Sequence, residues 1–271
     1  MSIPLEKCIA KTIDGKPGMG VLEHCRIVGN VAKKLIDRLP KKVVQILPEC
    51  SAVIAALHDV GKVSPGFQKK VADKYIGALD PELAKMPNSN FETDHCSVGA
   101  AAIRAKIKSF SDEDLAEIVA EIIGCHHGVL PAATASSDLG SKFGGPEWAK
   151  KRSQLIDTII SEFGPLKKIP DKRPVLALLE GLVTVSDWIG SDEEFFPPQG
   201  LPPGEDVSTR AAQALDACGW LVPTVIPNLS FEEIFGFSPN SLQERFIEVV
   251  DGQGLYILES PMGSGKTEAA L

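Results

Sequence analysis

The feature that most constrains this chain is an apolar run that ends in an adjacent histidine and aspartate. Residues 51–57 have the composition of a buried helix, and His58 and Asp59 follow directly. Gly61 stands where a helix takes its left-handed stop, so we expect His58 and Asp59 in the last turn. Unpaired carbonyls give that end of a helix a partial negative charge, which favours a cation. The stretch therefore predicts a metal site in which Asp59, with two oxygens, bridges two ions.

Helical periodicity between Gly, Pro, Ser and Asp residues predicts an all-α fold for the first two hundred residues. The expected helices are 20–38, 48–60, 95–109, 112–127, 147–163, 173–189 and 206–218. Two longer irregular stretches, 77–94 and 128–146, interrupt them. Connections of this length commonly face a substrate.

A change in composition at residues 195–204, which are rich in proline and glycine, marks an edge of the helical part. We expect a domain over 1–220, a proline-containing linker over 221–240 and a separate short segment over 241–271. The 271 residues, 44% of them apolar, are enough for a full core.

The overall charge and the lack of long apolar runs narrow the function classes. A net charge of −8 does not favour a protein that coats nucleic acid through bulk electrostatics, so a polyanion must be held locally. No run approaches the roughly 20 apolar residues that cross a bilayer, and the first residues lack the apolar core of a signal peptide. The six cysteines form no C-x-x-C pair, so we expect reduced thiols in a cytoplasmic protein with no membrane partner.

The five histidines of the chain all lie at expected helix starts or ends. Asp187 lies in an apolar helix, where a carboxylate is costly unless it is paired or metal-bound. The candidate metal ligands are His24, His58, Asp59, His95, His126, His127 and Asp187. Imidazoles and carboxylates suit manganese, iron, cobalt, nickel or zinc, and seven such groups are too many for one tetrahedral zinc. The set therefore predicts two metal ions.

Each candidate also has an ordinary alternative, because a single histidine is commonly a hydrogen-bonded core residue or a helix cap. Cys25, Cys96 and Cys125 each neighbour a histidine of the set, so a thiolate ligand is conceivable. Free cysteine is commonly a small core residue, which is the alternative for all three. The joint pattern of histidines and carboxylates favours the metal site.

The order of these residues resembles the HD metal-dependent phosphohydrolase superfamily and, within it, the HD nuclease domain of the CRISPR-associated type I helicase-nuclease. The resemblance covers about residues 15–195 and leaves none of the family's metal positions empty. It implies one ion held by His24, His58, Asp59 and Asp187, and a second held by Asp59, His95, His126 and His127. It also implies that Lys62 contacts phosphate or supports the ligands. No Gly-Tyr-Pro follows the paired histidines, which disfavours the cyclic-dinucleotide phosphodiesterase branch.

The last residues contain a glycine-rich phosphate loop. Residues 254–259 predict a buried strand, and the loop leads into an expected helix at 268–271. The expected ATP phosphate-binding residues are Gly263, Ser264, Gly265, Lys266 and Thr267. The loop is similar to motif I of superfamily 2 helicases, and this resemblance implies that Gln243 contacts adenine.

The sequence therefore predicts a truncated beginning of a RecA-like α/β domain after the helical domain. Such a domain needs on the order of a hundred more residues to cover its sheet. Because the sequence ends at Leu271, we expect no helicase or ATPase activity here, and a role for ATP and magnesium only in a full-length protein.

Together the resemblances imply a two-metal nuclease that hydrolyses phosphodiester bonds of single-stranded DNA, with Asp59 as the catalytic bridge and Lys62 beside it. They imply a Cascade-type CRISPR surveillance complex as partner, and we expect the isolated domain to be a monomer. One alternative is a phosphohydrolase of small nucleotides, which needs a closed pocket rather than an open groove. Another is a metal-stabilised docking module without turnover.

Overall fold

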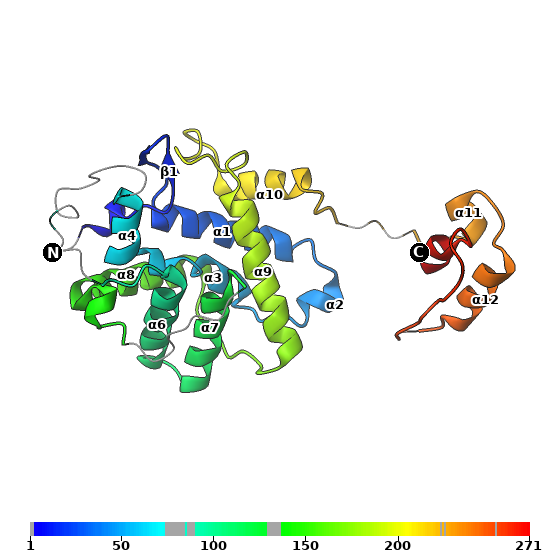
Figure 1. Cartoon of the computed structure of the whole chain (residues 1–271), viewed down its shortest axis with the longest axis horizontal. Coiled ribbons are helices and arrows are strands. Elements are labelled where there is room, and N and C mark those ends of the chain that lie inside the picture. The colour runs from blue at the N-terminus through cyan, green and yellow to red at the C-terminus, as the bar shows by residue number, and fades with distance from the viewer. Residues whose placement is uncertain are drawn as a thin grey trace. The chain divides into compact units, whose positions relative to one another are not determined.

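The computed structural model describes residues 3–73, 85, 90–128, 137–222, 224, 226–252 and 254–271. The chain divides into two units, Met1–Val222 and Pro223–Leu271 (Figure 1). Parts of the two irregular stretches expected at 77–94 and 128–146 lie outside the described residues.

The first unit is built from helices, which confirms the predicted all-α fold. Its longer helices are α1 (Val21–Ile36), α3 (Ser51–Ala56), α4 (Pro65–Val71), α6 (His95–Lys108), α7 (Glu113–Cys125), α8 (Gly145–Phe163), α9 (Arg173–Ser191) and α10 (Val207–Ala217). The shorter elements are η1 (Leu5–Lys7), α2 (Lys41–Val44), η2 (Val60–Lys62) and η4 (Ser141–Phe143). The sheet in the described residues is one antiparallel hairpin of β1 (Thr12–Ile13) and β2 (Lys16–Pro17), with Thr12 opposite Pro17. None of the described helices is long and apolar enough to cross a membrane.

Helix α3 forms the centre of the core, because every one of its residues is buried. It packs against α1, α8 and α9, and α6 lies beside α7 (Figure 1). On α1 the buried residues include His24, Val28, Val31 and Leu35, a spacing that places one stripe of the helix against the core. The apolar residues of this stripe each contribute about 1.5–3 kcal/mol by burial. The same stripe carries His24 into the interior.

The predicted helix ends near the His-Asp pair are wrong by a few residues. Helix α3 ends at Ala56 and α7 at Cys125, so the His-Asp pair and the histidine pair follow their helices instead of closing them. Gly61 does not adopt a left-handed conformation. A Cβ at Gly61 would lie 1.9 Å from the carbonyl oxygen of His95, so glycine is needed there because the backbone of α6 packs directly on η2.

Helices α2 and α4 and the hairpin were not predicted from the sequence. Helix α4 has a local signal, because the Ser64 hydroxyl accepts a hydrogen bond of 3.3 Å from the Phe67 amide and Pro65 begins the helix. The strands of the hairpin are two residues long, too short to show a period.

The second unit contains α11 (Phe231–Phe235), α12 (Ser241–Val249) and α13 (Lys266–Ala270). Helix α11 lies inside the segment expected as a linker, and a Ser230–Glu233 capping box begins it. The prediction of a buried strand at 254–259 is not realised in this chain. These residues form no strand, and the side chains of Leu255 and Ile257 are 90% and 76% exposed, because no described segment pairs with them.

Candidate metal centre

Three helical segments bring a first group of predicted ligands together. His24 comes from α1, Asp59 and His58 from the turn after α3, and Asp187 from α9. The Nε2 atom of His24 lies 3.1 Å from Asp59 Oδ2 and 3.4 Å from Asp187 Oδ1. The Nε2 atom of His58 lies 3.2 Å from each of the same two oxygens. Two imidazoles and two carboxylates therefore surround one point.

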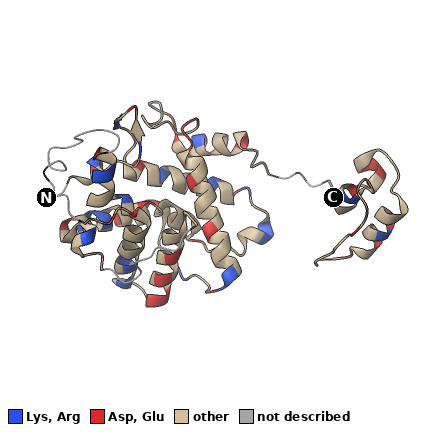
Figure 2. Cartoon of the chain, viewed as in Figure 1, with Lys and Arg blue, Asp and Glu red and all other residues tan. Residues whose placement is uncertain are grey.

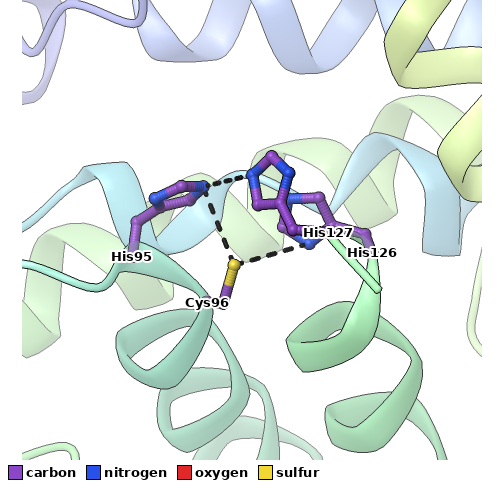
Figure 3. A group of neighbouring side chains, drawn as sticks. All are labelled: His95, Cys96, His126 and His127. Carbon is purple, nitrogen blue, oxygen red and sulfur yellow. Dashed lines mark hydrogen bonds between the residues drawn. The ribbon is translucent and has the colours of Figure 1, made fainter. Parts of the chain in front are cut away.

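A second group lies on the other side of Asp59. His95 begins α6, and the adjacent His126 and His127 follow α7 (Figure 3). The Nε2 atoms of His95 and His126 lie 3.4 Å and 4.0 Å from Asp59 Oδ1, and the Nε2 atoms of His95 and His127 are 3.2 Å apart. Asp59 thus presents Oδ2 to the first group and Oδ1 to the second. The structure brings all seven predicted ligands into one centre.

Hydrogen bonds from the helix ends orient two of the imidazoles. His58 Nδ1 lies 2.9 Å from the Ala55 carbonyl oxygen, and His126 Nδ1 lies 2.6 Å from the Ile123 carbonyl oxygen. A carbonyl only accepts, so each Nδ1 carries a proton, and Nε2 is the ring nitrogen that faces the centre and can give a lone pair to a metal. The free carbonyls of the two helix ends therefore select the tautomer that binds metal.

Supporting contacts come from residues that the sequence analysis did not single out. The Ser191 hydroxyl donates a hydrogen bond of 2.9 Å to Asp187 Oδ1, and the Thr184 hydroxyl donates one of 3.2 Å to the His126 carbonyl oxygen. Ser191 follows Asp187 by one helical turn, a spacing visible in the sequence. The first contact orients Asp187 within α9, and the second joins α9 to the end of α7.

The residues present fit a pair of metal ions. Several buried polar atoms of the centre have no hydrogen-bond partner within the described part of the chain, namely both ring nitrogens of His24, Nε2 of His58, Nε2 of His126 and both carboxylate oxygens of Asp59. Such atoms are costly unless they bind a ligand. Donor atoms about 2.1 Å from one ion stand about 3.0–3.4 Å apart, and the separations in the first group are 3.1–3.4 Å.

The electrostatics of the first group keep its carboxylates ionised. Burial raises the pKa of Asp59, but the charges of Lys62 and His58 outweigh burial and hold the pKa well below its usual range. Burial likewise raises the pKa of Asp187, and the two histidines of the group outweigh it. Burial lowers the pKa of His58, yet the two carboxylates raise it to about 10. A divalent cation would satisfy the same excess of negative charge.

The second group has neutral imidazoles instead. Burial and the charge of Lys62 lower the pKa of His95 to about 4, even though Asp59 raises it. Burial and the neighbouring His58 lower the pKa of His126 to about 4. Both rings are neutral at pH 7 and therefore have a lone pair for a metal.

Lys62 and Cys96 lie beside the ligands. Lys62 Nζ is 2.5 Å from Asp59 Oδ2, on the side of the first group. Cys96 Sγ is 3.9 Å from His95 Nε2 and 4.0 Å from His126 Nδ1 (Figure 3). The other two cysteines considered as ligands are Cys25, which is buried in the core, and Cys125, which is half-buried.

The phosphate loop of the second unit closes on itself. Lys266 Nζ donates hydrogen bonds of 2.7 Å to the carbonyl oxygens of Ser260 and Pro261. Gln243 is buried, and its side-chain amide donates a hydrogen bond of 2.9 Å to the Gly265 carbonyl oxygen and accepts one of 2.8 Å from the Asn240 amide. Both ends of the Gln243 amide are therefore occupied, and the adenine contact stays a prediction.

Comparison with known families places this centre. The family model for the Cas3 HD domain matches residues 10–196. The chain belongs to the Cas3 HD domain family. The match includes every predicted metal ligand of the first unit, and this confirms the resemblance inferred from the sequence.

Relatives of this Cas3 HD domain are longer proteins. The CRISPR-associated nuclease/helicase Cas3 of Streptococcus thermophilus is 28% identical over an alignment of 274 positions, which covers 88% of this chain and 28% of the relative. The crystal structure of T. fusca Cas3-AMPPNP is similar with a TM-score of 0.73 and 25% identity, over 100% of this chain and 34% of that one. The chain therefore spans about a third of the length of these relatives.

A structure of the HD domain alone shares the fold. The crystal structure of the Thermus thermophilus Cas3 HD domain in the presence of Ni²⁺ has a TM-score of 0.57 and 22% identity to this chain. The likeness covers 80% of this chain and 90% of that one. The helical unit described above is thus a known fold.

Proposed function

We propose that this Cas3 HD domain is a metal-dependent nuclease that hydrolyses phosphodiester bonds of single-stranded DNA in type I CRISPR interference. The observation that carries the proposal is the arrangement around Asp59, whose Oδ2 faces two imidazoles and whose Oδ1 faces two others. A carboxylate placed in this way separates and bridges two ions. The S. thermophilus relative is named a nuclease/helicase, which supports nucleic acid as the substrate class.

The cofactors that we propose are two divalent transition metal ions, manganese, iron, cobalt or nickel. One would be held by His24, His58, Asp59 and Asp187, and the other by Asp59, His95, His126 and His127. Imidazole-rich ligand sets suit these metals, and the Ni²⁺ present with the T. thermophilus HD domain supports the choice. When bound, such a pair lowers the pKa of a water and stabilises the attacking and leaving oxygens of an in-line displacement.

The chain's own residues prepare this site. Asp59 is the proposed catalytic residue, because its two oxygens set the spacing of the two ligand groups. Lys62 Nζ, 2.5 Å from Asp59 Oδ2, keeps that carboxylate ionised and offers a positive charge to the phosphate. The Nδ1 contacts of His58 and His126 hold their rings so that Nε2 faces the metals.

The open side of the centre supports a polymeric substrate. His127 is exposed and His95 is 16% exposed, whereas the His24 and His58 side chains are fully buried. A strand can therefore approach the second ligand group from solvent, which favours DNA over a small nucleotide held in a closed pocket.

We also propose how the activity is organised along the chain. The nuclease would occupy 1–220, 221–240 would connect it, and 241–271 would begin a helicase domain that uses ATP and magnesium in a full-length protein. The boundary between the two units, at Val222 and Pro223, supports this division. A Cascade-type surveillance complex is the proposed partner that delivers DNA, by analogy with the CRISPR-associated relatives.

The test is cleavage of circular single-stranded DNA by metal-stripped protein to which manganese, cobalt, nickel, iron or magnesium is added. We expect cleavage with a transition metal and its loss in Asp59→Asn, which keeps the side-chain volume but removes the charge of the bridge. Asp114→Asn, an exposed position on α7, is the matched control and should cleave normally. Hydrolysis of free nucleotides without any DNA cleavage would instead assign a small-molecule phosphohydrolase.

A further inference from the structure

Lys11 extends from the amino-terminal hairpin to the rim of the metal centre. It lies at the base of the hairpin, where the Ala10 amide donates a hydrogen bond of 2.8 Å to the Met19 carbonyl oxygen. Its ammonium group donates a hydrogen bond to the Ser191 carbonyl oxygen at the end of α9. Ser191 also donates to Asp187, so one residue joins Lys11 to a proposed ligand.

The Lys11 ammonium has hydrogen-bond donors that are not used. It is half-buried, and among the described residues it forms one hydrogen bond and no ion pair with a carboxylate. An ammonium has three donors, so two of them are left for another acceptor. A partly buried cation without an anionic partner is costly, and an added anion would remove that cost.

A buried glutamine fixes Lys11 relative to Lys62. The side chain of Gln68 is fully buried and donates hydrogen bonds of 2.9 Å to the carbonyl oxygens of both Ile9 and Lys62. It also accepts a hydrogen bond of 3.1 Å from the Ile9 amide. The backbone two residues before Lys11 and the backbone of Lys62 are therefore held by one side chain, which preorganises the two cations.

The local charges would favour an anion at this place once two metal ions are bound. Burial and the charge of Lys62 lower the pKa of Lys11, while Asp187, Glu193 and Asp59 raise it, and the net direction is downward. Without metal, Lys11 and Lys62 carry two positive charges against the three negative charges of Asp59, Asp187 and Glu193. Two divalent ions would leave the centre strongly positive, which attracts more than one phosphate.

We propose that Lys11 binds the phosphate next to the scissile phosphate of a polynucleotide. The inference rests on the proposed nuclease function and deepens it. Lys62 contacts the bridging carboxylate and so lies at the scissile position. The Lys11 contact at Ser191 is one helical turn beyond Asp187, about 6 Å along α9, so Lys11 lies beside the first ligand group at a distance comparable to the spacing of neighbouring phosphates.

Three substitutions at Lys11 separate charge from tethering. Lys11→Arg keeps the charge and the donors, Lys11→Gln keeps a donor for Ser191 but no charge, and Lys11→Met keeps neither. Lys16→Gln, an exposed lysine on the same hairpin, is the matched control. Binding is measured by anisotropy of a labelled oligothymidylate with chelator present, over a range of salt concentrations. Kinetics are measured with manganese on the oligothymidylate and on bis(p-nitrophenyl) phosphate, which has a single phosphate.

We expect Lys11→Gln and Lys11→Met to weaken oligothymidylate binding about tenfold, as for one lost ion pair with phosphate. The slope of log affinity against log salt should fall in magnitude by about 0.7, the value for one contact to a single strand. The KM should rise several-fold more for the oligothymidylate than for the single-phosphate compound. Lys11→Arg should restore most of the binding, and Lys16→Gln should match the wild type.

Three results would overturn the inference. Binding and salt slope unchanged in Lys11→Gln would show that the charge meets no phosphate. Oligothymidylate binding that is weakened in Lys11→Met but equally strong in Lys11→Gln and Lys11→Arg would show that Lys11 only tethers α9. Equal KM changes for both substrates would place Lys11 on the scissile phosphate. Failure of the wild type to cleave DNA with any metal would reject the proposed nuclease instead, and the binding measurement would still decide the role of Lys11.

Discussion

Replacing Arg152 by methionine should remove about half of the stability of the helical unit. The Arg152 side chain is fully buried on α8, and its guanidinium donates hydrogen bonds to Asp138 Oδ1 at 2.7 Å, to the Val63 carbonyl oxygen at 2.9 Å and to the Phe143 carbonyl oxygen at 3.0 Å. It also donates one of 3.0 Å to the Asp138 carbonyl oxygen. Val63 directly follows η2, so this one side chain fixes the segment that carries Lys62.

The expected magnitude follows from what the substitution leaves behind. Arg152→Met leaves the buried Asp138 carboxylate without its cation and the carbonyl oxygens of Val63 and Phe143 without their donor. Breaking a buried pair from one side costs about 3–5 kcal/mol, out of the roughly 5–15 kcal/mol that stabilises a domain. For a unit of this size we expect the melting temperature to fall by about 6–20 °C.

The assay is urea denaturation followed by far-ultraviolet circular dichroism, with the slope compared between variants so that midpoints report stability. Arg26→Met is the matched control. Arg26 makes a similar two-point contact to Glu162, but their side chains are 43% and 34% exposed, so its loss should cost about 0–1 kcal/mol.

A double variant tests the reason for the loss. Burial raises the pKa of Asp138 and lowers that of Arg152, so the pair is costly to bury even when it is formed. Arg152→Met combined with Asp138→Leu should therefore recover most of the stability. A cost of Arg152→Met no larger than that of Arg26→Met would refute the reasoning.

Three further predictions follow from the structure. Gly61→Ala should destabilise the fold by several times the ~1 kcal/mol typical of point variants, because its Cβ would lie 1.9 Å from the His95 carbonyl oxygen. The control Gly181→Ala, whose Cβ would have no atom within 4 Å, should raise the stability measured by denaturation slightly. Asp206→Ala should lower the melting temperature at neutral pH only, because hydrogen bonds from Thr209 lower the pKa of Asp206 in the folded protein. The stabilisation by Asp206 is present above the ordinary carboxyl pKa and is lost as the pH falls through the folded value. The melting temperatures of the variant and the wild type should therefore converge between pH 7 and pH 3. Added manganese or nickel should raise the melting temperature of stripped protein in a concentration-dependent way, and no shift at millimolar metal would contradict a preformed centre.

The long helices were predictable because their apolar period persists over several turns. The predicted helix at 95–109 agrees with α6 to within one residue. Its start was visible because the Asp94 carboxylate is a helix cap, which accepts hydrogen bonds of 3.1 Å from the amides of Cys96 and Ser97. The end of α3 was not predictable, because the apolar run continues past Ala56 to Leu57 and neither glycine nor proline follows directly. What ends α3 there is packing of η2 on α6, a contact between distant parts of the sequence.

In the candidate site, too, some residues could be predicted from local sequence and others depend on contacts between distant parts of the chain. The ligands could be identified from the sequence for two reasons. Asp187 is a carboxylate in an apolar helix, which is rare, and the histidines fall at expected helix starts or ends. The supporting residues were not identifiable in this way. Gln68 contacts Ile9 across 59 positions, and Lys11 contacts Ser191 across 180 positions, so only the folded chain brings them together. A lysine and a glutamine in isolation carry no pattern that distinguishes them from ordinary surface residues.

The distribution of charge reconciles the proposed polyanionic substrate with a net charge of −8. Acidic side chains gather along α7, whereas α4 and the first turns of α8 carry lysines and arginine (Figure 2). Repulsion from α7 acts through solvent and is screened within about 10 Å at 0.1 M salt. The attraction at the centre acts at contact distance in a partly buried site, where screening is weak. Local cations and the proposed metal ions would therefore outweigh the net charge at the centre.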